Sequence, residues 1–196
     1  MGLRRRRQQV KPVEKKVSVT VDAQGIQTFL SGVAAKRQQG ASIRFVCIGT
    51  DQSTGDAFGP LVGSMLKEYG WADVIGTLDR PLDAKQIAVQ QISPREGTIT
   101  ITIDACLGKA DSVGKYAVSE GPLRPGEGVG LKLDPIGDYA IAGVVNELGP
   151  KPYRTLQATS LYLVMEMARE AAGAIDRALR CQADGDSLAN HKEELR

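Results

Sequence analysis

Two aspartates, Asp56 and Asp104, are the residues of this sequence whose type and placement best suit chemistry. Asp56 follows the apolar segment 42–48 after a short polar loop, and Asp104 directly follows the β-branched segment 97–103. Two carboxylates held close together cannot both ionise cheaply, so the pKa of one is raised. The protonated carboxyl can then act as general acid while the other activates water as base. The pattern therefore indicates an aspartate pair working by general acid–base catalysis.

A structural alternative exists for each aspartate. Asp56 precedes an apolar helical pattern and could cap that helix, while Asp104 could hydrogen-bond a turn. Taken singly, each residue fits the structural role better than the catalytic one. Their placement after neighbouring strands, with glycines around both, favours the catalytic interpretation.

The residues that serine and cysteine hydrolases need are not available in the predicted core. The sole histidine, His191, lies in a polar segment near the C-terminus, so a Ser-His-Asp triad or a Cys-His pair has no core histidine as general base. Ser64 falls well inside a predicted helix and does not form a nucleophile elbow. We therefore expect catalysis by carboxylates alone.

Cofactor-binding motifs are equally weak. Residues 49–55 connect a strand to a helix but contain neither Gly-Lys-Ser/Thr nor GxGxxG, and Asp51 and Asp56 would repel a phosphate. The cysteines, Cys47, Cys106 and Cys181, show no CxxC spacing and read as reduced thiols. We expect no cofactor and no metal.

The elements that must position the aspartates alternate between strand and helix. Periodicity predicts strands over 17–21, 42–48, 74–78, 97–103, 116–120 and 139–145, and helices over 22–37, 56–69, 83–91 and 155–180. Asp22 and Thr155 are the expected caps of the first and last helices. This order predicts a three-layer α/β/α sandwich with a mostly parallel sheet. Ligands of such sheets bind outside the carboxyl ends of the strands, where both aspartates are expected.

Length and composition fit one globular domain. The chain has 196 residues, of which 42% are hydrophobic and 24% charged. We expect a basic tail over 1–16, a domain over 17–182 and a polar tail over 183–196. The basic tail has no interleaved aromatic residues, which argues against nucleic-acid binding. We expect no signal peptide; the sequence has no bilayer-length apolar run, and reduced thiols favour a cytoplasmic location.

Three motifs, in order, resemble a known family. Residues 48–60 (IGTDQSTGDAFGP) resemble the motif of bacterial spore germination proteases, where Gly-x-Gly-Asn is followed by Thr-Pro-Asp-Ala-Leu-Gly-Pro. Residues 103–105 (IDA) resemble their Ile-Asp-Ala-Leu, and residues 125–130 (PGEGVG) resemble their Pro-Gly-x-Gly-Val-Gly loop. The residues of these motifs and the length of the chain are most similar to those of the shorter, related sporulation proteins called YyaC-like.

The resemblance implies a phosphorylase/hydrolase-like fold, shared with hydrogenase maturation endopeptidases. It implies that Asp56 and Asp104 match the two aspartates of the germination protease, which cleaves small acid-soluble spore proteins as a spore wakes. It also implies that this chain acts in the developing spore compartment. Substrate contacts are then expected from Thr50 and Asp51 in the first motif and from the loop glycines Gly126, Gly128 and Gly130. The hydrogenase endopeptidases bind nickel through two acids and a histidine, and that histidine has no counterpart here.

Departures from the family pattern keep a second function open. Thr50 replaces Asn, Gly55 replaces Pro, Phe58 replaces Leu, and Cys106 replaces the Leu that follows Asp-Ala. We expect an endopeptidase that acts on a protein or peptide. We expect no membrane partner, and the sequence leaves a homo-oligomer open. The alternative is a catalytically silent sporulation protein that keeps the fold and acts by binding. The loop glycines likewise suit either close approach to substrate or a plain surface turn.

Overall fold

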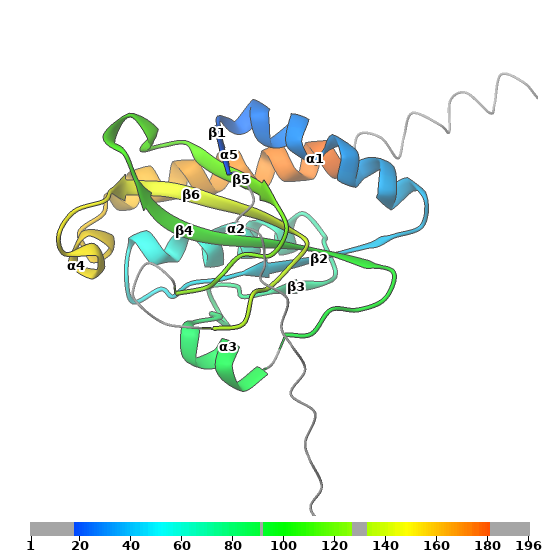
Figure 1. The fold of residues 1–196 in the computed structure, drawn as a ribbon, viewed down its shortest axis with the longest axis horizontal. Coiled ribbons are helices and arrows are strands. Elements are labelled where there is room, and N and C mark those ends of the chain that lie inside the picture. The colour runs from blue at the N-terminus through cyan, green and yellow to red at the C-terminus, as the bar shows by residue number, and fades with distance from the viewer. Residues whose placement is uncertain (1–17, 91, 127–132, 181–196) are drawn as a thin grey trace, which may run out of the picture.

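One sheet organises the molecule. The computed structural model describes residues 18–90, 92–126 and 133–180, and within them six strands pair in the order β1-β5-β6-β4-β2-β3 (Figure 1). The strands are β1 (Val19–Val21), β2 (Ser42–Cys47), β3 (Val74–Ile75), β4 (Thr98–Gly108), β5 (Tyr116–Glu120) and β6 (Tyr139–Glu147). Strands β3, β2, β4 and β6 run parallel, while β5 and β1 join antiparallel at one edge. The predicted mostly parallel sheet is confirmed.

Helices cover both faces, which confirms the three-layer architecture (Figure 1). The helices α1 (Ala23–Gln38), α2 (Phe58–Glu68) and α5 (Leu161–Arg180) pack on one face around a core shared with β2, β4 and β6. The short α3 (Ala84–Gln90) covers the other face, where Ile87 joins Val46 and Ile48 at the end of β2 in a second, smaller cluster. Alternation along the strands sends successive side chains to these two layers.

The first helix begins where the sequence predicts. The Asp22 side chain accepts a hydrogen bond from the Gly25 amide, with 2.8 Å between Oδ1 and N. Burial of Ile26, Leu30 and Val33 then fixes the apolar stripe of α1 against the sheet.

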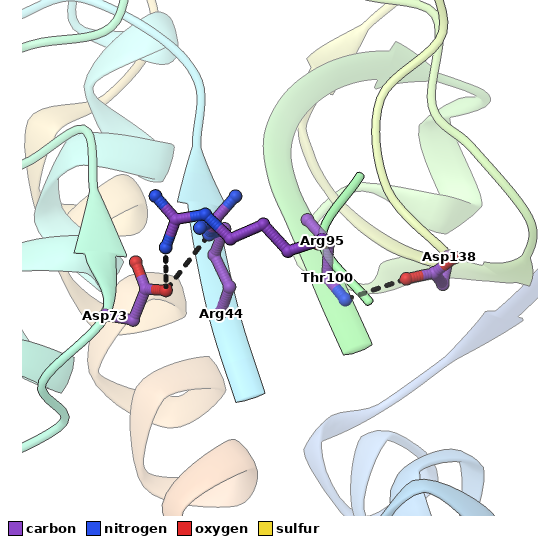
Figure 2. A network of polar contacts seen from close by, with 5 residues as sticks. All are labelled: Arg44, Asp73, Arg95, Thr100 and Asp138. Atoms are coloured by element: carbon purple, nitrogen blue, oxygen red, sulfur yellow. Dashed lines mark hydrogen bonds and ion pairs between the residues drawn. The ribbon is translucent and has the colours of Figure 1, made fainter. Parts of the chain in front are cut away.

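A buried arginine holds the amino ends of the strands together (Figure 2). The Arg44 side chain is 3% exposed, and its Nε lies 3.0 Å from Asp73 Oδ2. Arg95 reaches the same oxygen from the segment before β4, at 3.2 Å. Nearby, the Thr100 amide donates to Asp138 Oδ2 at 2.8 Å, which ties β4 to the segment that enters β6. These contacts stabilise the sheet at the end opposite the two aspartates.

The C-terminal helix differs from its prediction. Residues 155–180 do not form one helix, because α4 (Pro152–Gln157) ends before α5 begins at Leu161. Thr155 lies inside α4 and donates its hydroxyl to the Lys151 carbonyl, so it caps neither helix. Ser160 is the residue at the start of α5, where its Oγ accepts from the Leu163 amide at 3.4 Å.

Two further findings concern the limits of the described chain. The expected tails, 1–16 and all of 183–196, lie outside the described residues. Within the described residues, no helix combines the length and hydrophobicity needed to cross a bilayer.

Candidate active site at the carboxyl ends of β2 and β4

The chain leaves β2 and β4 toward opposite edges of the sheet. The next strand after β2 is β3, on one side, whereas the next strand after β4 is β5, beyond β6 on the other side. In α/β sheets such a divergence leaves a crevice at the carboxyl ends of the two strands. Asp56 belongs to the connection that follows β2, and Asp104 belongs to β4 itself.

Close backbone packing turns the loop after β2 back on itself. Gly49 has a φ of 144°, and a Cβ on it would lie 1.9 Å from the Asp56 carbonyl oxygen. The Thr50 amide donates to that same oxygen at 3.2 Å. Only glycine fits this position, so the loop delivers Asp56 directly above the end of β2.

The sequence predicted that Asp56 opens the helix after β2. Instead, Asp56 lies in a 3₁₀ turn, Gly55–Ala57 (η1), and α2 begins after it at Phe58. Neither this turn nor α2 has a side-chain capping hydrogen bond. The capping role that competed with catalysis is therefore not realised for Asp56. Its carboxyl is half-buried, and this burial raises its pKa, an effect that the Ser53 hydroxyl partly offsets.

Asp104 is placed differently from its prediction. It does not end a strand, because β4 continues to Gly108 through pairing with β6. The pairing of β4 with β2, however, ends at Cys47 and Ile103, so Asp104 is the first residue of β4 beyond the end of its neighbour. Its Oδ1 accepts a hydrogen bond from the Ala105 amide at 2.7 Å.

The two carboxyl groups influence each other. Burial raises the pKa of Asp104 from 3.8 to about 8, the Ala105 amide lowers it, and the negative charge of Asp56 raises it further. Residual solvent contact of Asp104 moderates the upward shift without reversing its direction. Near neutral pH, a carboxyl group with a pKa of about 8 is mostly protonated, and the charge of Asp56 adds to that shift.

Cys106 lies on the same face of β4 as Asp104, two residues further along the strand. Burial and the Asp104 charge raise the pKa of its thiol to about 12. A thiol that stays protonated at neutral pH is a poor nucleophile. Cys106 therefore does not supply the covalent chemistry that its position next to Asp104 would otherwise invite.

The expected substrate-binding residues divide between two loops. Thr50 and Asp51 lie in the same loop as Asp56; the Thr50 hydroxyl accepts from the Gln52 amide, and Asp51 is exposed. Gly126 has a φ of 71°, in the conformation that favours glycine, while Gly128 and Gly130 lie outside the described residues. Ile136, which pairs with Leu123 at the base of the second loop, accepts from the Thr102 hydroxyl at 3.0 Å. That loop therefore starts on the face of β4 that carries Asp104.

Ser53 is a residue of this site that the sequence argument did not select. It is 5% exposed, and its Oγ has no hydrogen-bond partner at regular distance and angle, although it lies close enough to Asp56 to lower the pKa of that carboxyl. The spacing Ser-x-x-Asp was visible in the sequence, but it is typical of a capping box and points to structure rather than chemistry.

Two cavities of the described structure lie at the other end of the sheet. One, of about 560 Å³, contacts Trp71 and the start of β2, and the other, of about 810 Å³, contacts Lys36, Tyr139 and the start of β4. Neither is lined by Asp56 or Asp104. Among the residues that the structure describes, no three His, Cys, Asp or Glu side chains are grouped as a metal site would require.

Comparison with known proteins identifies the family. Residues 16–173 match the family model described as "Protein of unknown function (DUF1256)". The chain belongs to the DUF1256 family. A curated relative, "Uncharacterized protein YyaC" of Bacillus subtilis (strain 168), is 43% identical over 155 residues, which are 76% of this chain and 75% of the relative. The predicted likeness to YyaC is thus confirmed for this DUF1256 protein.

A solved structure also resembles the DUF1256 chain. It is the crystal structure of a [NiFe] hydrogenase maturation protease, HycI, from Thermococcus kodakarensis KOD1, at 21% identity and a TM-score of 0.48. The match covers 71% of this chain and 93% of that one.

Proposed function

We propose that this DUF1256 protein is an endopeptidase that uses Asp56 and Asp104 as one acid–base pair. The observation that carries the proposal is the placement of both aspartates at the carboxyl ends of the neighbouring strands β2 and β4, where burial raises the pKa of Asp104 and the charge of Asp56 adds to that rise. Two carboxyl groups that share one proton are suited to peptide hydrolysis, because one must remove a proton while the other delivers one.

The reaction assigns one step to each group. The ionised Asp56 takes a proton from a water molecule as that water attacks the peptide carbonyl carbon. The protonated Asp104 delivers its proton to the carbonyl oxygen, which gives a neutral tetrahedral diol. Transfer of a proton from Asp56 to the leaving nitrogen and return of a diol proton to Asp104 release the amine and the acid and restore both groups. No cofactor takes part in these steps.

The proposed substrates come from the motif resemblance to spore germination proteases. That likeness favours small acid-soluble spore proteins and a role in sporulation, in the spore compartment. Asp56 does not cap a helix, and the loop after β2 packs tightly around its backbone. Both observations support a role for this aspartate other than helix capping.

A binding protein without catalysis is the second candidate. The observation that favours it is the position of the two cavities, both away from the aspartate pair. In that case recognition of a protein partner would lie at the end of the sheet that carries the two cavities, and the two aspartates would have no chemical role.

Incubation with spore protein extract separates the two candidates. New peptide termini, read by mass spectrometry, should appear with the wild type and be lost in Asp104→Asn. Asp111→Asn is the matched control, because Asp111 is an exposed aspartate close behind β4. No cleavage by any variant, with specific retention of one extract protein, would favour the binding role.

Chelator provides a further arm of the same assay. Two carboxylates without a histidine make a poor transition-metal site, so cleavage should persist in EDTA. Strong inhibition that a divalent metal reverses would replace the metal-free mechanism with a metal-dependent one.

A further inference from the structure

The Ser53 hydroxyl requires an explanation that the fold alone does not give. Ser53 is 5% exposed, and its Oγ has no regular hydrogen-bond partner in the structure. A buried polar group without a partner costs about 1–3 kcal/mol, so such groups in folded proteins usually serve a further purpose.

Local geometry directs this hydroxyl toward Asp56. The Ala57 amide donates to the Ser53 carbonyl at 3.0 Å, which closes one turn over residues 53–57. Residues three apart in such a turn lie on the same side, so the side chains of Ser53 and Asp56 lie on one side of it. The Thr50 amide holds the Asp56 carbonyl from the other side, which leaves the turn little freedom.

We propose that Ser53 is a positioning residue of the aspartate pair, whose hydroxyl donates to the Asp56 carboxylate and thereby keeps the shared proton on Asp104. This inference rests on the proposed function, and it gives each aspartate a separate role. Asp56 is the base because Ser53 stabilises its charged form, and Asp104 is the acid because burial and the charge of Asp56 both favour its protonated form.

The electrostatics of the site agree with this division. Burial raises the pKa of both carboxyl groups; the Ser53 hydroxyl partly offsets this at Asp56, whereas at Asp104 the Ala105 amide offsets part of it and the charge of Asp56 adds to it. A carboxylate that accepts a hydroxyl hydrogen bond favours its ionised form. The same hydrogen bond would fix the orientation of Asp56 toward the water that it activates.

The other titratable groups around the η1 turn do not account for the difference between the pKa shifts of Asp56 and Asp104. The first two turns of α2 contain none, and β4 supplies only Asp104 and the protonated Cys106. In α4, Tyr153 and Arg154 are exposed, while the start of α5 supplies Tyr162, also exposed, and Glu166. The pKa shift of Asp56 is accounted for by burial and Ser53 alone.

The test is a carbon-13 NMR titration of the aspartate carboxyl groups in the full chain. Ser53→Ala should raise the apparent pKa of Asp56, and Ser53→Thr, which keeps a hydroxyl, should restore it toward the wild-type value. Ser31→Ala is the matched control, because it removes a hydroxyl from α1 that bonds the Thr28 carbonyl. If the alanine variant does not fold, Ser53→Cys fills the same space with a weaker donor and should give a rise in the same direction.

Activity adds an independent readout. In the extract assay, Ser53→Ala should move the acidic limb of the pH–rate profile to higher pH, because Asp56 must ionise to act as base. An unchanged Asp56 titration in both Ser53→Ala and Ser53→Cys would overturn the inference. A wild type without peptidase activity, but with the expected titration shifts, would overturn the proposed function and leave the Ser53–Asp56 contact standing.

Discussion

At the residue scale, two side chains of one type behave differently because their surroundings differ. The sequence alone singled out Asp56 and Asp104 as candidates, since each follows a recognisable apolar segment. It was insufficient to order their pKa values, because burial of Asp104 depends on strands and loops distant in the sequence. Ser53 was missed for the same reason: its spacing signals a cap, and only the folded turn shows a buried hydroxyl beside Asp56.

Replacing either aspartate by asparagine should abolish cleavage without unfolding the protein. Asparagine is close to aspartate in shape but has neither the charge nor the exchangeable proton, and such acid–base groups contribute about 10²–10⁴-fold in rate. We expect losses in that range for Asp56→Asn and Asp104→Asn, with unchanged circular dichroism. Cleavage that persists in both variants at the rate of Asp111→Asn would refute the pair.

Asp104 should also make stability depend on pH. Its pKa is about 8 in the folded protein against 3.8 ordinarily, so the folded state binds the extra proton between these values. The contribution to stability is complete below pH 4 and is lost as the pH rises toward 8, by up to about 1.4 kcal/mol per pH unit. Partial solvent contact of Asp104 makes the shift smaller and so narrows the pH range over which this stability is lost.

Thermal unfolding at pH 5 and pH 8 measures that effect. The Tm of Asp104→Asn minus the Tm of the wild type should be more positive at pH 8 than at pH 5, because the wild type loses stability as Asp104 ionises and asparagine does not ionise. Equal Tm differences at both pH values would show that Asp104 ionises in the folded state as an ordinary exposed carboxyl does.

At the element scale, local sequence signals predicted the elements but not where two of them end. The continuation of β4 through Gly108 comes from pairing with β6. No local pattern in residues 104–108 predicts this pairing. The break between α4 and α5 is likewise held by tertiary contacts, since the Asn146 amide of β6 donates to Thr159 Oγ1 at 3.2 Å. Asp22 was predictable as a cap because its signal is entirely local.

The junction between β2 and α2 should be sensitive to a single added methyl group. A Cβ on Gly59 would lie 2.0 Å from the Ile48 carbonyl oxygen, so Gly59→Ala must separate the helix from the strand. We expect a loss of about 2–4 kcal/mol in the free energy of unfolding, within the range known for overpacked or strained sites.

Gly32→Ala is the control for that substitution. Gly32 lies inside α1, and a methyl group added to it would have no neighbour within 4 Å, so alanine should stabilise the helix by up to about 1 kcal/mol. Urea unfolding of both variants measures the contrast. A Gly59→Ala protein as stable as Gly32→Ala would contradict the close approach of α2 to β2.

At the scale of the whole molecule, the order of the strands determines where the site lies. Alternating strands and helices predicted the layers and the mostly parallel sheet, but the order β1-β5-β6-β4-β2-β3 needed the structure. That order places β2 beside β4 and sends their connections apart, so Asp56 and Asp104 both lie at the carboxyl ends of these two neighbouring strands. The polar contacts of Arg44 and Asp73 hold the opposite end (Figure 2).

The basic N-terminal segment should be dispensable for this architecture. Residues 1–16 combine a run of arginines with no apolar periodicity, and the family match begins at residue 16. A protein lacking residues 2–16 should have a Tm within about one degree of the full chain, in keeping with a change in stability of a few tenths of a kcal/mol. A loss of several degrees would show that this segment packs on the sheet or its helices.

The central claim is that Asp56 and Asp104 titrate as one coupled pair, and carbon-13 NMR of the Asp104 carboxyl tests it most directly. In the wild type, Asp104 should titrate far above its ordinary value, near pH 8. In Asp56→Asn, where the neighbouring charge is gone, its pKa should fall while burial keeps it above 3.8. An Asp104 carboxyl that titrates near pH 4 in the wild type, or at the same pH with and without Asp56, would contradict the account.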